Sequence, residues 1–250
     1  MAKDESVQYA LGSTDKEHDR LIRQAARLSP ISEGFFRDAG VGVGQRILDV
    51  GSGVGDVTML MARVVGPSGE VVGIDRDQRS IDRARARMVE AGFRNVRFQR
   101  SDVSEVVDEK DFDAVVGRFI LMFLPDPVAV LRSLSKLARP GGVLAFQEVS
   151  WAPFLALTAH LPLWSACLSV ILQAFKGCGA NSEMGPALYR IFQEAGLPAP
   201  SMQLEVPLGD DAEFTRMPHD LLLSLKPQIG RQRIALEPLG DFDTLPSRLQ

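Results

Sequence analysis

Between residues 46 and 149, short apolar runs alternate with longer segments whose apolar positions recur at helical spacing. The short runs are rich in branched residues, which favours buried strands, and the longer segments favour amphipathic helices. Strands and helices that alternate in this way form a parallel sheet with right-handed crossovers. The predicted strands are residues 47–50, 71–75, 96–102, 112–116 and 143–146, with a sixth strand at 202–206.

Predicted helices lie before, between and after these strands. The first covers residues 15–28, where acids stand in the first turn and Pro30 marks the end. We interpret residues 1–45 as a helical cover that precedes a core domain of residues 46–250. The remaining predicted helices are residues 57–65, 81–88, 127–137 and 184–195.

A stretch without charged residues follows the fifth predicted strand. Residues 151–175 contain no Asp, Glu, Lys or Arg and are long enough to cross a membrane. Pro153, Pro162 and His160 interrupt this stretch, so a membrane span is rejected. We predict instead a helical insertion, residues 151–184, that forms a lid over a ligand pocket. Core packing or a dimer interface remains the alternative for these residues.

The core is arranged around residues 46–58, with the sequence RILDVGSGVGDVT. An apolar strand is followed by a turn that contains Gly51, Gly53 and Gly55, and then by a helix. Such a turn brings backbone N–H groups and the positive end of a helix dipole close to a ligand. This arrangement predicts a ligand site at the carboxyl end of the first strand.

Two acids argue against a dinucleotide as this ligand. The glycine spacing is GxGxG, with Asp56 in place of the third glycine of the dinucleotide fingerprint, and Asp49 stands just before the turn. Two carboxylates would repel a pyrophosphate, whereas Asp49 would favour a ligand with an ammonium group. Asp75 ends the second predicted strand, where a carboxylate can accept both hydroxyls of a ribose. The expected ligand therefore has a ribose and an ammonium group, and no phosphate.

The pattern Asp49-x-Gly51-x-Gly53-x-Gly55 resembles the first motif of the class I methyltransferases that use S-adenosylmethionine (SAM). The resemblance implies a doubly wound, mostly parallel α/β fold of the Rossmann-like type, with SAM as cofactor and S-adenosylhomocysteine as product. It also implies that Asp102 meets the adenine amino group and that Arg118 lies beside the methionine part of SAM. The implied cofactor-binding residues are Asp49, Gly51, Ser52, Gly53, Gly55, Asp75, Arg76, Asp102, Val103 and Arg118.

A second stretch, LARPGGVLAFQE at residues 137–148, resembles the corresponding segment of the ubiquinone and menaquinone C-methyltransferases and their small-molecule relatives. This resemblance implies a small-molecule acceptor, and an aromatic lid would make that acceptor hydrophobic or aromatic. In the family a seventh, antiparallel strand completes the sheet. The polar tail at residues 240–250 contains no pattern for it, so we expect an exposed sheet edge at residues 202–206.

Methyl transfer from a sulfonium is an in-line displacement, so the protein chiefly positions the acceptor and, where needed, removes a proton. Glu148 and His160 are the candidates for a base or an orienting group, because Glu148 ends a strand at the ligand crevice and histidine titrates near neutrality. A packing role is the alternative for His160. The candidate acceptor-binding residues are Tyr9, Trp151, Phe154 and Trp164. Tyr9 is included because in many relatives an aromatic residue from this region closes over SAM.

Composition narrows the choice of partners. A chain of 250 residues with 45% hydrophobic residues can bury one sizeable core. The net charge of -4 and the scattered basic residues form no basic patch, so we expect a small-molecule partner and no nucleic acid. Cys167 and Cys178 lack metal-type spacing, and the charged N-terminus lacks a signal-peptide core, which predicts a cytoplasmic protein without a bound metal. A homodimer is left open.

Three functions compete at this point. The leading hypothesis is a SAM-dependent methyltransferase that acts on a small, hydrophobic or aromatic acceptor. The second is a SAM-binding or regulatory protein of the same fold without catalysis, which the missing last strand keeps open. The third, a nucleotide-linked oxidoreductase, is disfavoured by Asp49 and Asp56.

Overall fold

The computed structural model describes residues 11–103 and 109–250, and the chain divides into two compact units. The sheet unit consists of residues 13–148 and 187–201, and it contains every strand of the described chain. The helical unit consists of residues 149–186 and 202–250, together with Leu11 and Gly12. The predicted boundary between a cover, residues 1–45, and a core domain stays a prediction.

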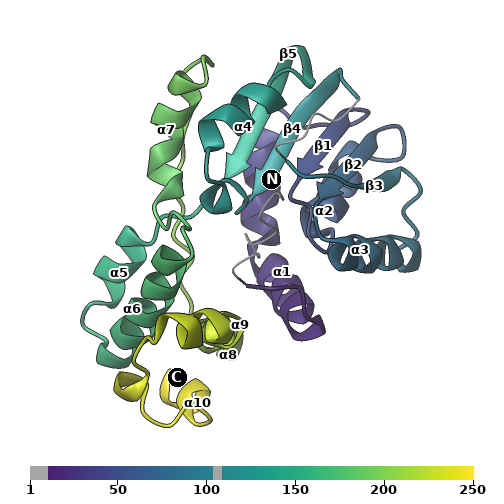
Figure 1. The fold of residues 1–250 in the computed structure, drawn as a ribbon. Helices are drawn as coiled ribbons and strands as arrows, with labels where there is room; N and C mark the ends of the chain where they lie inside the picture. The colour runs from purple at the N-terminus through teal and green to yellow at the C-terminus, as the bar shows by residue number, and fades with distance from the viewer. Residues whose placement is uncertain (1–10, 104–108) are drawn as a thin grey trace, which may run out of the picture. The chain divides into compact units, whose positions relative to one another are not determined.

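The sheet unit contains a parallel sheet of five strands in the order β3-β2-β1-β4-β5 (Figure 1). The order changes direction between β1 and β4, so their carboxyl ends flank the switch point at which open α/β sheets bind ligands. The predicted doubly wound, Rossmann-like fold is confirmed. The strands are β1 Arg46–Val50, β2 Glu70–Asp75, β3 Val96–Arg100, β4 Phe112–Arg118 and β5 Ala138–Gln147.

Helices pack on this sheet through their apolar faces. Leu60 and Met61 of α2 are buried with Ile47 of β1, and Ile81 of α3 is buried with Phe98 of β3. Full burial of one such side chain stabilises the fold by about 1.5–3 kcal/mol. The helices of this unit are α1 Asp15–Asp38, α2 Asp56–Val65, α3 Gln78–Glu90, η1 Leu121–Phe123, α4 Pro127–Leu134 and most of α7 Met184–Glu194.

The first helix is longer than predicted. α1 continues through Pro30 to Asp38, so the predicted stop at Pro30 is wrong. An interior proline costs a helix about 3 kcal/mol, because it removes one hydrogen bond and crowds the preceding turn. Ser32 and Phe36, which lie beyond the proline, are completely buried (0% exposed). Burial of this later part of α1 offsets the cost of the proline.

The predicted sixth strand at residues 202–206 is wrong. These residues adopt no regular structure and pair with no strand, and Leu204 is 65% exposed. Their apolar and polar positions alternate as in a half-buried strand, but a strand also needs a neighbouring backbone and an apolar surface to cover it. Within the described residues the sheet therefore has no sixth or seventh strand, and its two edges are β3 and β5 rather than residues 202–206.

Several element boundaries also differ from the prediction. β3 ends at Arg100 rather than at residue 102, and α4 ends at Leu134 rather than at residue 137. β5 begins at Ala138 rather than at residue 143, with an irregular register against the start of β4. Glycine permits this early pairing, since a Cβ on Gly142 would lie only 2.9 Å from the carbonyl oxygen of Arg139.

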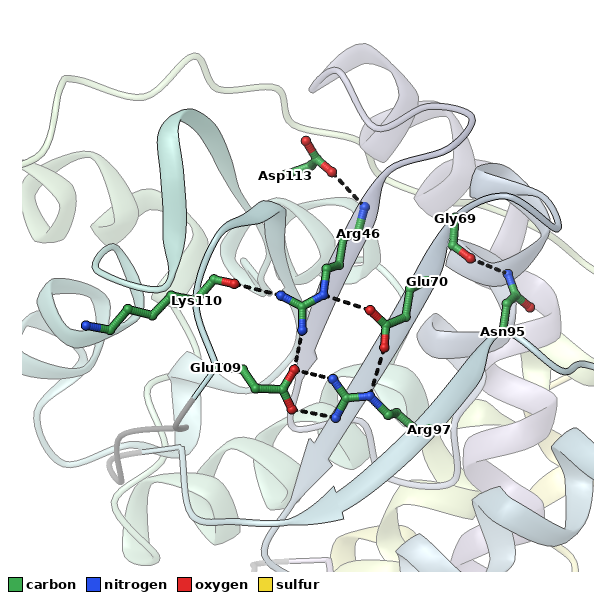
Figure 2. A network of polar contacts seen from close by, with 8 residues as sticks. All are labelled: Arg46, Gly69, Glu70, Asn95, Arg97, Glu109, Lys110 and Asp113. Carbon is green, nitrogen blue, oxygen red and sulfur yellow. Dashed lines mark hydrogen bonds and ion pairs between the residues drawn. The ribbon is translucent and has the colours of Figure 1, made fainter.

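A polar network connects the amino-terminal ends of the strands (Figure 2). Arg46 of β1 donates to Glu70 of β2 at 2.7 Å, to Glu109, and to the carbonyl of Lys110 at 2.6 Å. Arg97 of β3 donates to the same two carboxylates, and it lowers the pKa of both below the usual value. Partly exposed pairs of this kind contribute up to about 1 kcal/mol each. The network links β1, β2 and β3 at their amino-terminal ends, away from the carboxyl ends where ligands bind in such sheets.

The helical unit is built on α6 and α9, which pack side by side (Figure 1). Leu168 and Ile171 of α6 and Leu222 and Leu225 of α9 are fully buried. Among the described residues, no helix is long and apolar enough to cross a membrane. The helices of this unit are α5 Ala152–Thr158, α6 Pro162–Gly177, α8 Ala212–Thr215, α9 Met217–Gln232, η2 Glu237–Leu239 and α10 Leu245–Arg248.

Candidate functional site

The glycine loop between β1 and α2 has a backbone that requires glycine. Gly51, Gly53 and Gly55 have φ values of 69°, 53° and 86°, all in the left-handed region. Two of them also lack room for a side chain: a Cβ on Gly51 would lie 2.7 Å from Ile120, and one on Gly55 would lie 3.0 Å from Met88. A Cβ on Gly53 would meet nothing within 4 Å. Gly53 is therefore the glycine whose backbone is open to a ligand.

Asp75, the last residue of β2, is bonded to this loop. Its Oδ2 accepts a hydrogen bond from the Gly53 amide at 2.8 Å, and its Oδ1 accepts one from the Asp77 amide at 2.8 Å. Partial burial raises the pKa of Asp75, although the two backbone hydrogen bonds oppose that shift. Arg76, predicted beside it, has an exposed side chain. The glycine loop and Asp75 are thus joined by a hydrogen bond, and their role as a cofactor site stays a prediction.

Asp49 lies inside the sheet rather than at its surface. The side chain is buried (1% exposed), and its Oδ2 accepts a hydrogen bond from the Thr58 hydroxyl at 2.5 Å. Burial raises the pKa of Asp49 to about 7, with the Thr58 hydrogen bond and the charge of Arg118 acting in the opposite direction. Its predicted contact with the cofactor stays a prediction. Thr58 was not predicted, because only the fold brings it to the acid.

The charge of Asp56 is compensated by an ion pair that the sequence did not predict. Arg87 of α3 pairs with it at 2.8 Å and also donates to the carbonyl of Val54. The two carboxylates therefore repel a pyrophosphate less than the sequence predicts. Asp56 is paired with Arg87, and burial raises the pKa of Asp49 to about 7.

Arg118, the last residue of β4, is hydrogen-bonded to an uncharged side chain. Its Nη1 donates to the Ser32 hydroxyl at 3.1 Å, and that hydroxyl donates to Oε1 of Gln147 at 2.7 Å. Burial lowers the pKa of Arg118, while Asp56 and Asp49 raise it from a distance. Arg118 forms no ion pair with a residue in the described part of the chain. Sequence analysis missed Ser32 and Gln147, whose polar atoms meet only after α1 packs on the sheet.

Glu148 follows β5 and turns toward the loop after β4. Its Oε1 accepts hydrogen bonds from the amides of Ile120 at 2.9 Å and Leu121 at 2.7 Å. Its Oε2 is buried and has no hydrogen-bond partner among the residues described. Burial raises the pKa of Glu148 to about 7 against the effect of the backbone amides. The predicted role of Glu148 as a base stays a prediction.

The other predicted cofactor residues lie after β3. Asp102 and Val103 are half-buried, and the preceding Ser101 donates its amide to the carbonyl of Asp75 at 3.0 Å. This bond places the chain after β3 beside the end of β2. Contacts of Asp102 and Val103 with adenine stay predictions.

Three of the predicted acceptor-binding residues form one aromatic cluster in the helical unit. The ring centroids of Trp151 and Phe154 are 6.2 Å apart, and those of Phe154 and Trp164 are 5.9 Å apart. Phe214, which sequence analysis missed, stacks on Trp164 at 5.7 Å. The Trp164 indole donates to the carbonyl of Leu249 at 3.2 Å. These rings pack against one another within this unit, and their role at an acceptor pocket stays a prediction.

Two further candidate residues are His160 and Tyr9. His160 lies exposed in the turn between α5 and α6, and its role as a base stays a prediction. Tyr9 lies outside the described residues. In the portion of the chain that the structure describes, no group of His, Cys, Asp and Glu side chains could hold a metal ion.

Comparison with known proteins identifies relatives of this chain. A family model described as a methyltransferase domain matches residues 42–196. The chain is 30% identical over 152 residues to the demethylmenaquinone methyltransferase of Staphylococcus aureus strain JH9. That match covers 60% of this chain and 62% of the relative, so the chain spans less than two thirds of the length of that protein.

Solved structures share the fold. The YcgJ protein from Bacillus subtilis superposes with a TM-score of 0.56 over 83% of this chain and 86% of its own, at 18% identity. A SAM-dependent methyltransferase from Aquifex aeolicus is 24% identical, with a TM-score of 0.49 over 55% of this chain and 74% of its own. The first of these likenesses supports the fold and nothing finer.

Proposed function

Because the chain belongs to the family of methyltransferase domains, we propose that it transfers a methyl group from SAM to a small acceptor of hydrophobic or aromatic character. The SAM cofactor predicted from the glycine motif is confirmed by the match to methyltransferases. The same match disfavours the nucleotide-linked oxidoreductase. When bound, SAM supplies a methyl group on a positively charged sulfur.

The observation that carries this proposal is the bond between Gly53 and Asp75 beside an open approach. A ligand can reach the backbone at Gly53, because nothing lies within 4 Å of the position a Cβ would take. The Ser52 hydroxyl is buried next to it and lacks a partner among the described residues. An open backbone and an unpaired hydroxyl suit a ligand that brings its own polar groups.

Asp75 would hold the ribose of SAM. An ionised carboxylate has about four acceptor sites, and two are used by the amides of Gly53 and Asp77. The remaining sites can accept the two ribose hydroxyls without loss of the existing bonds. Asp75 would thus join the glycine loop and the cofactor in one hydrogen-bonded unit.

Arg118 would hold a carboxylate at the other end of SAM, or one on the acceptor. Its guanidinium is held by the neutral Ser32 hydroxyl, so its charge is not consumed by a protein ion pair in the described chain. A partly buried cation binds a carboxylate more strongly than an exposed one, since less water competes.

Two observations support a proposal for the chemical class of the acceptor. The curated relative is named for demethylmenaquinone, which is a quinone, and the aromatic cluster of the helical unit suits a hydrophobic or aromatic molecule. We therefore propose a quinone-like or phenolic acceptor, with His160 or Glu148 as the base that removes a proton when one is lost. Trp151, Phe154 and Trp164 are the residues that we propose to contact the acceptor.

Calorimetric titration with SAM, S-adenosylhomocysteine and NAD tests the cofactor, and the first two should bind while NAD does not. Production of S-adenosylhomocysteine is then measured with a short-chain demethylmenaquinone analogue, a phenol and an aliphatic amine. Production that depends on the quinone or the phenol supports the proposal. SAM binding without turnover on any acceptor would favour the SAM-binding protein that lacks catalysis.

A further inference from the structure

The turn after β4 has a backbone that needs external support. Phe119 has a φ of 55°, in the left-handed region that residues with side chains rarely adopt. Its amide donates to the carbonyl of Gln147 at 2.9 Å. The next two amides, those of Ile120 and Leu121, both donate to the Glu148 carboxylate. The end of β5 therefore holds three successive residues of this turn.

This turn also places the Ile120 side chain against Gly51 and Gly117. A Cβ on Gly51 would lie 2.7 Å from Ile120 Cδ1, and a Cβ on Gly117 would lie 3.0 Å from Ile120 Cγ2. Ile120 therefore fills the space that a side chain on Gly51 would take, and it shares the corresponding space at Gly117 with Phe146. Gly51 is the first glycine of the loop between β1 and α2, so the turn and the glycine loop are in direct contact.

The chemistry of Glu148 is unusual for a residue that only stabilises the fold. Its carboxylate is buried, one oxygen has no partner within the described residues, and burial disfavours its charged form. The groups that oppose this effect of burial on its pKa are the backbone amides of Ile120, Leu121 and Met122. What the carboxylate does provide is one oxygen that accepts two neighbouring amides at once.

We propose that Glu148 is a positioning residue, whose carboxylate holds the turn at residues 119–121 so that Ile120 keeps the glycine loop in its SAM-binding conformation. This inference rests on the proposed SAM site at the glycine loop. Glu148 acts on the cofactor through Ile120 and Gly51, and it need not touch SAM.

SAM affinity measured by calorimetry at about pH 8 tests the link. Glu148→Ala and Ile120→Ala should each weaken SAM binding by about tenfold, because each removes one step of the same chain of contacts. The double variant should be about as weak as either single variant, and not about a hundredfold weaker. Glu148→Gln should restore affinity to within about threefold of wild type, since an amide oxygen can still accept both backbone N–H groups.

Val71→Ala is the matched control for loss of stability. Val71 is fully buried at the amino-terminal end of β2, away from the turn, so this variant should lower the melting temperature and leave SAM affinity unchanged. Thermal unfolding of every variant then separates lost folding from lost positioning. Should Glu148→Ala fold poorly, Ile120→Ala tests the same link with the carboxylate intact.

Several outcomes would overturn the proposal. Normal SAM affinity in Glu148→Ala or Ile120→Ala would exclude the link, and multiplied losses in the double variant would show two independent effects. A loss of turnover in Glu148→Ala with unchanged SAM affinity would point to a base instead. Gly53→Val separates this inference from the proposed site, because normal SAM binding by that variant would remove the site itself.

Discussion

The amide of Gly53 donates a hydrogen bond of 2.8 Å to the carboxylate of Asp75, 22 residues further along the chain. This bond joins the glycine loop after β1 to the acid at the end of β2. The two features that the sequence offers as a SAM site are thus one hydrogen-bonded arrangement, and changes at either residue should affect the same ligand.

Asp75→Asn should weaken SAM binding while the fold is retained. Hydrogen bonds to charged groups contribute about 1.5–3 kcal/mol, which corresponds to a loss of affinity of about tenfold to more than a hundredfold. Calorimetric titration measures the loss. Glu70→Gln is the matched control, since Glu70 begins the same strand and is hydrogen-bonded to Arg46 and Arg97 at its opposite end (Figure 2). Equal SAM affinity in the two variants would contradict the assignment of Asp75.

Alanine at the three loop glycines should separate folding from binding. Gly51→Ala and Gly55→Ala should destabilise the fold, because each new Cβ collides with a neighbour as well as requiring a positive φ. Gly53→Ala meets no neighbour, so it should cost only the backbone strain, about 1 kcal/mol. Gly53→Val should keep the fold and abolish SAM binding. Circular dichroism during thermal unfolding and titration with SAM report the two effects, and a Gly53→Val variant that bound SAM normally would exclude the loop as the site.

The contribution of Asp49 and Glu148 to stability should fall as pH rises from about 4.5 to 7. Asp49 and Glu148 both have a pKa of about 7 in the folded chain, above the usual values of 3.8 and 4.5 for these side chains. Within this window the folded chain keeps protons that the unfolded chain has released, so a rise in pH lowers the free energy of unfolding. Above about pH 7 this contribution levels off.

Urea unfolding at a series of pH values measures this decline. Asp49→Asn should remove about half of it, and the double change with Glu148→Gln should remove most of it. Asp75, whose pKa is also raised, adds in the same direction and remains in both variants. Burial lowers the pKa of His18 and of His219, which acts in the opposite direction, so each variant is compared with the wild type at every pH. Variants with the same pH dependence as the wild type would contradict the burial of the two carboxyl groups.

Trp164 should stabilise the helical unit through its ring more than through its hydrogen bond. Trp164→Phe loses the bond from the indole to the Leu249 carbonyl but keeps an aromatic ring beside Phe214, so it should cost about 1 kcal/mol. Trp164→Ala should cost about 3–5 kcal/mol, because it opens a cavity. Chemical unfolding gives both values.

The same Trp164→Phe variant tests the lid hypothesis. If the cluster contributes to an acceptor pocket, SAM affinity should be unchanged while turnover with a hydrophobic acceptor falls. Light scattering serves as the control for the dimer alternative. Full turnover together with a changed mass would place these residues in an interface.

Much of the fold was predictable because its signals are local. The runs that form β1, β2 and β4 are apolar and branched, and they are buried on both sides, so periodicity alone identifies them. Gly66 and Gly92 mark the ends of α2 and α3, because glycine readily adopts the positive φ found where helices end. Residues 202–206 alternate apolar and polar positions but have no partner strand, and the stop signal of Pro30 is overridden by the burial of Phe36. Local signals cannot report what a segment will pack against.

The sequence by itself determined the glycine loop, the acids near the ends of the first two strands and the family to which they point, since backbone conformation and strand order depend on residues close together in the chain. Only the tertiary structure decided which atoms meet. Ser32 reaches Arg118, Thr58 reaches Asp49, and Glu148 binds the amides of Ile120 and Leu121 rather than standing free in the crevice. These contacts join segments that become neighbours only when helices and strands pack, so no spacing in the sequence could reveal them.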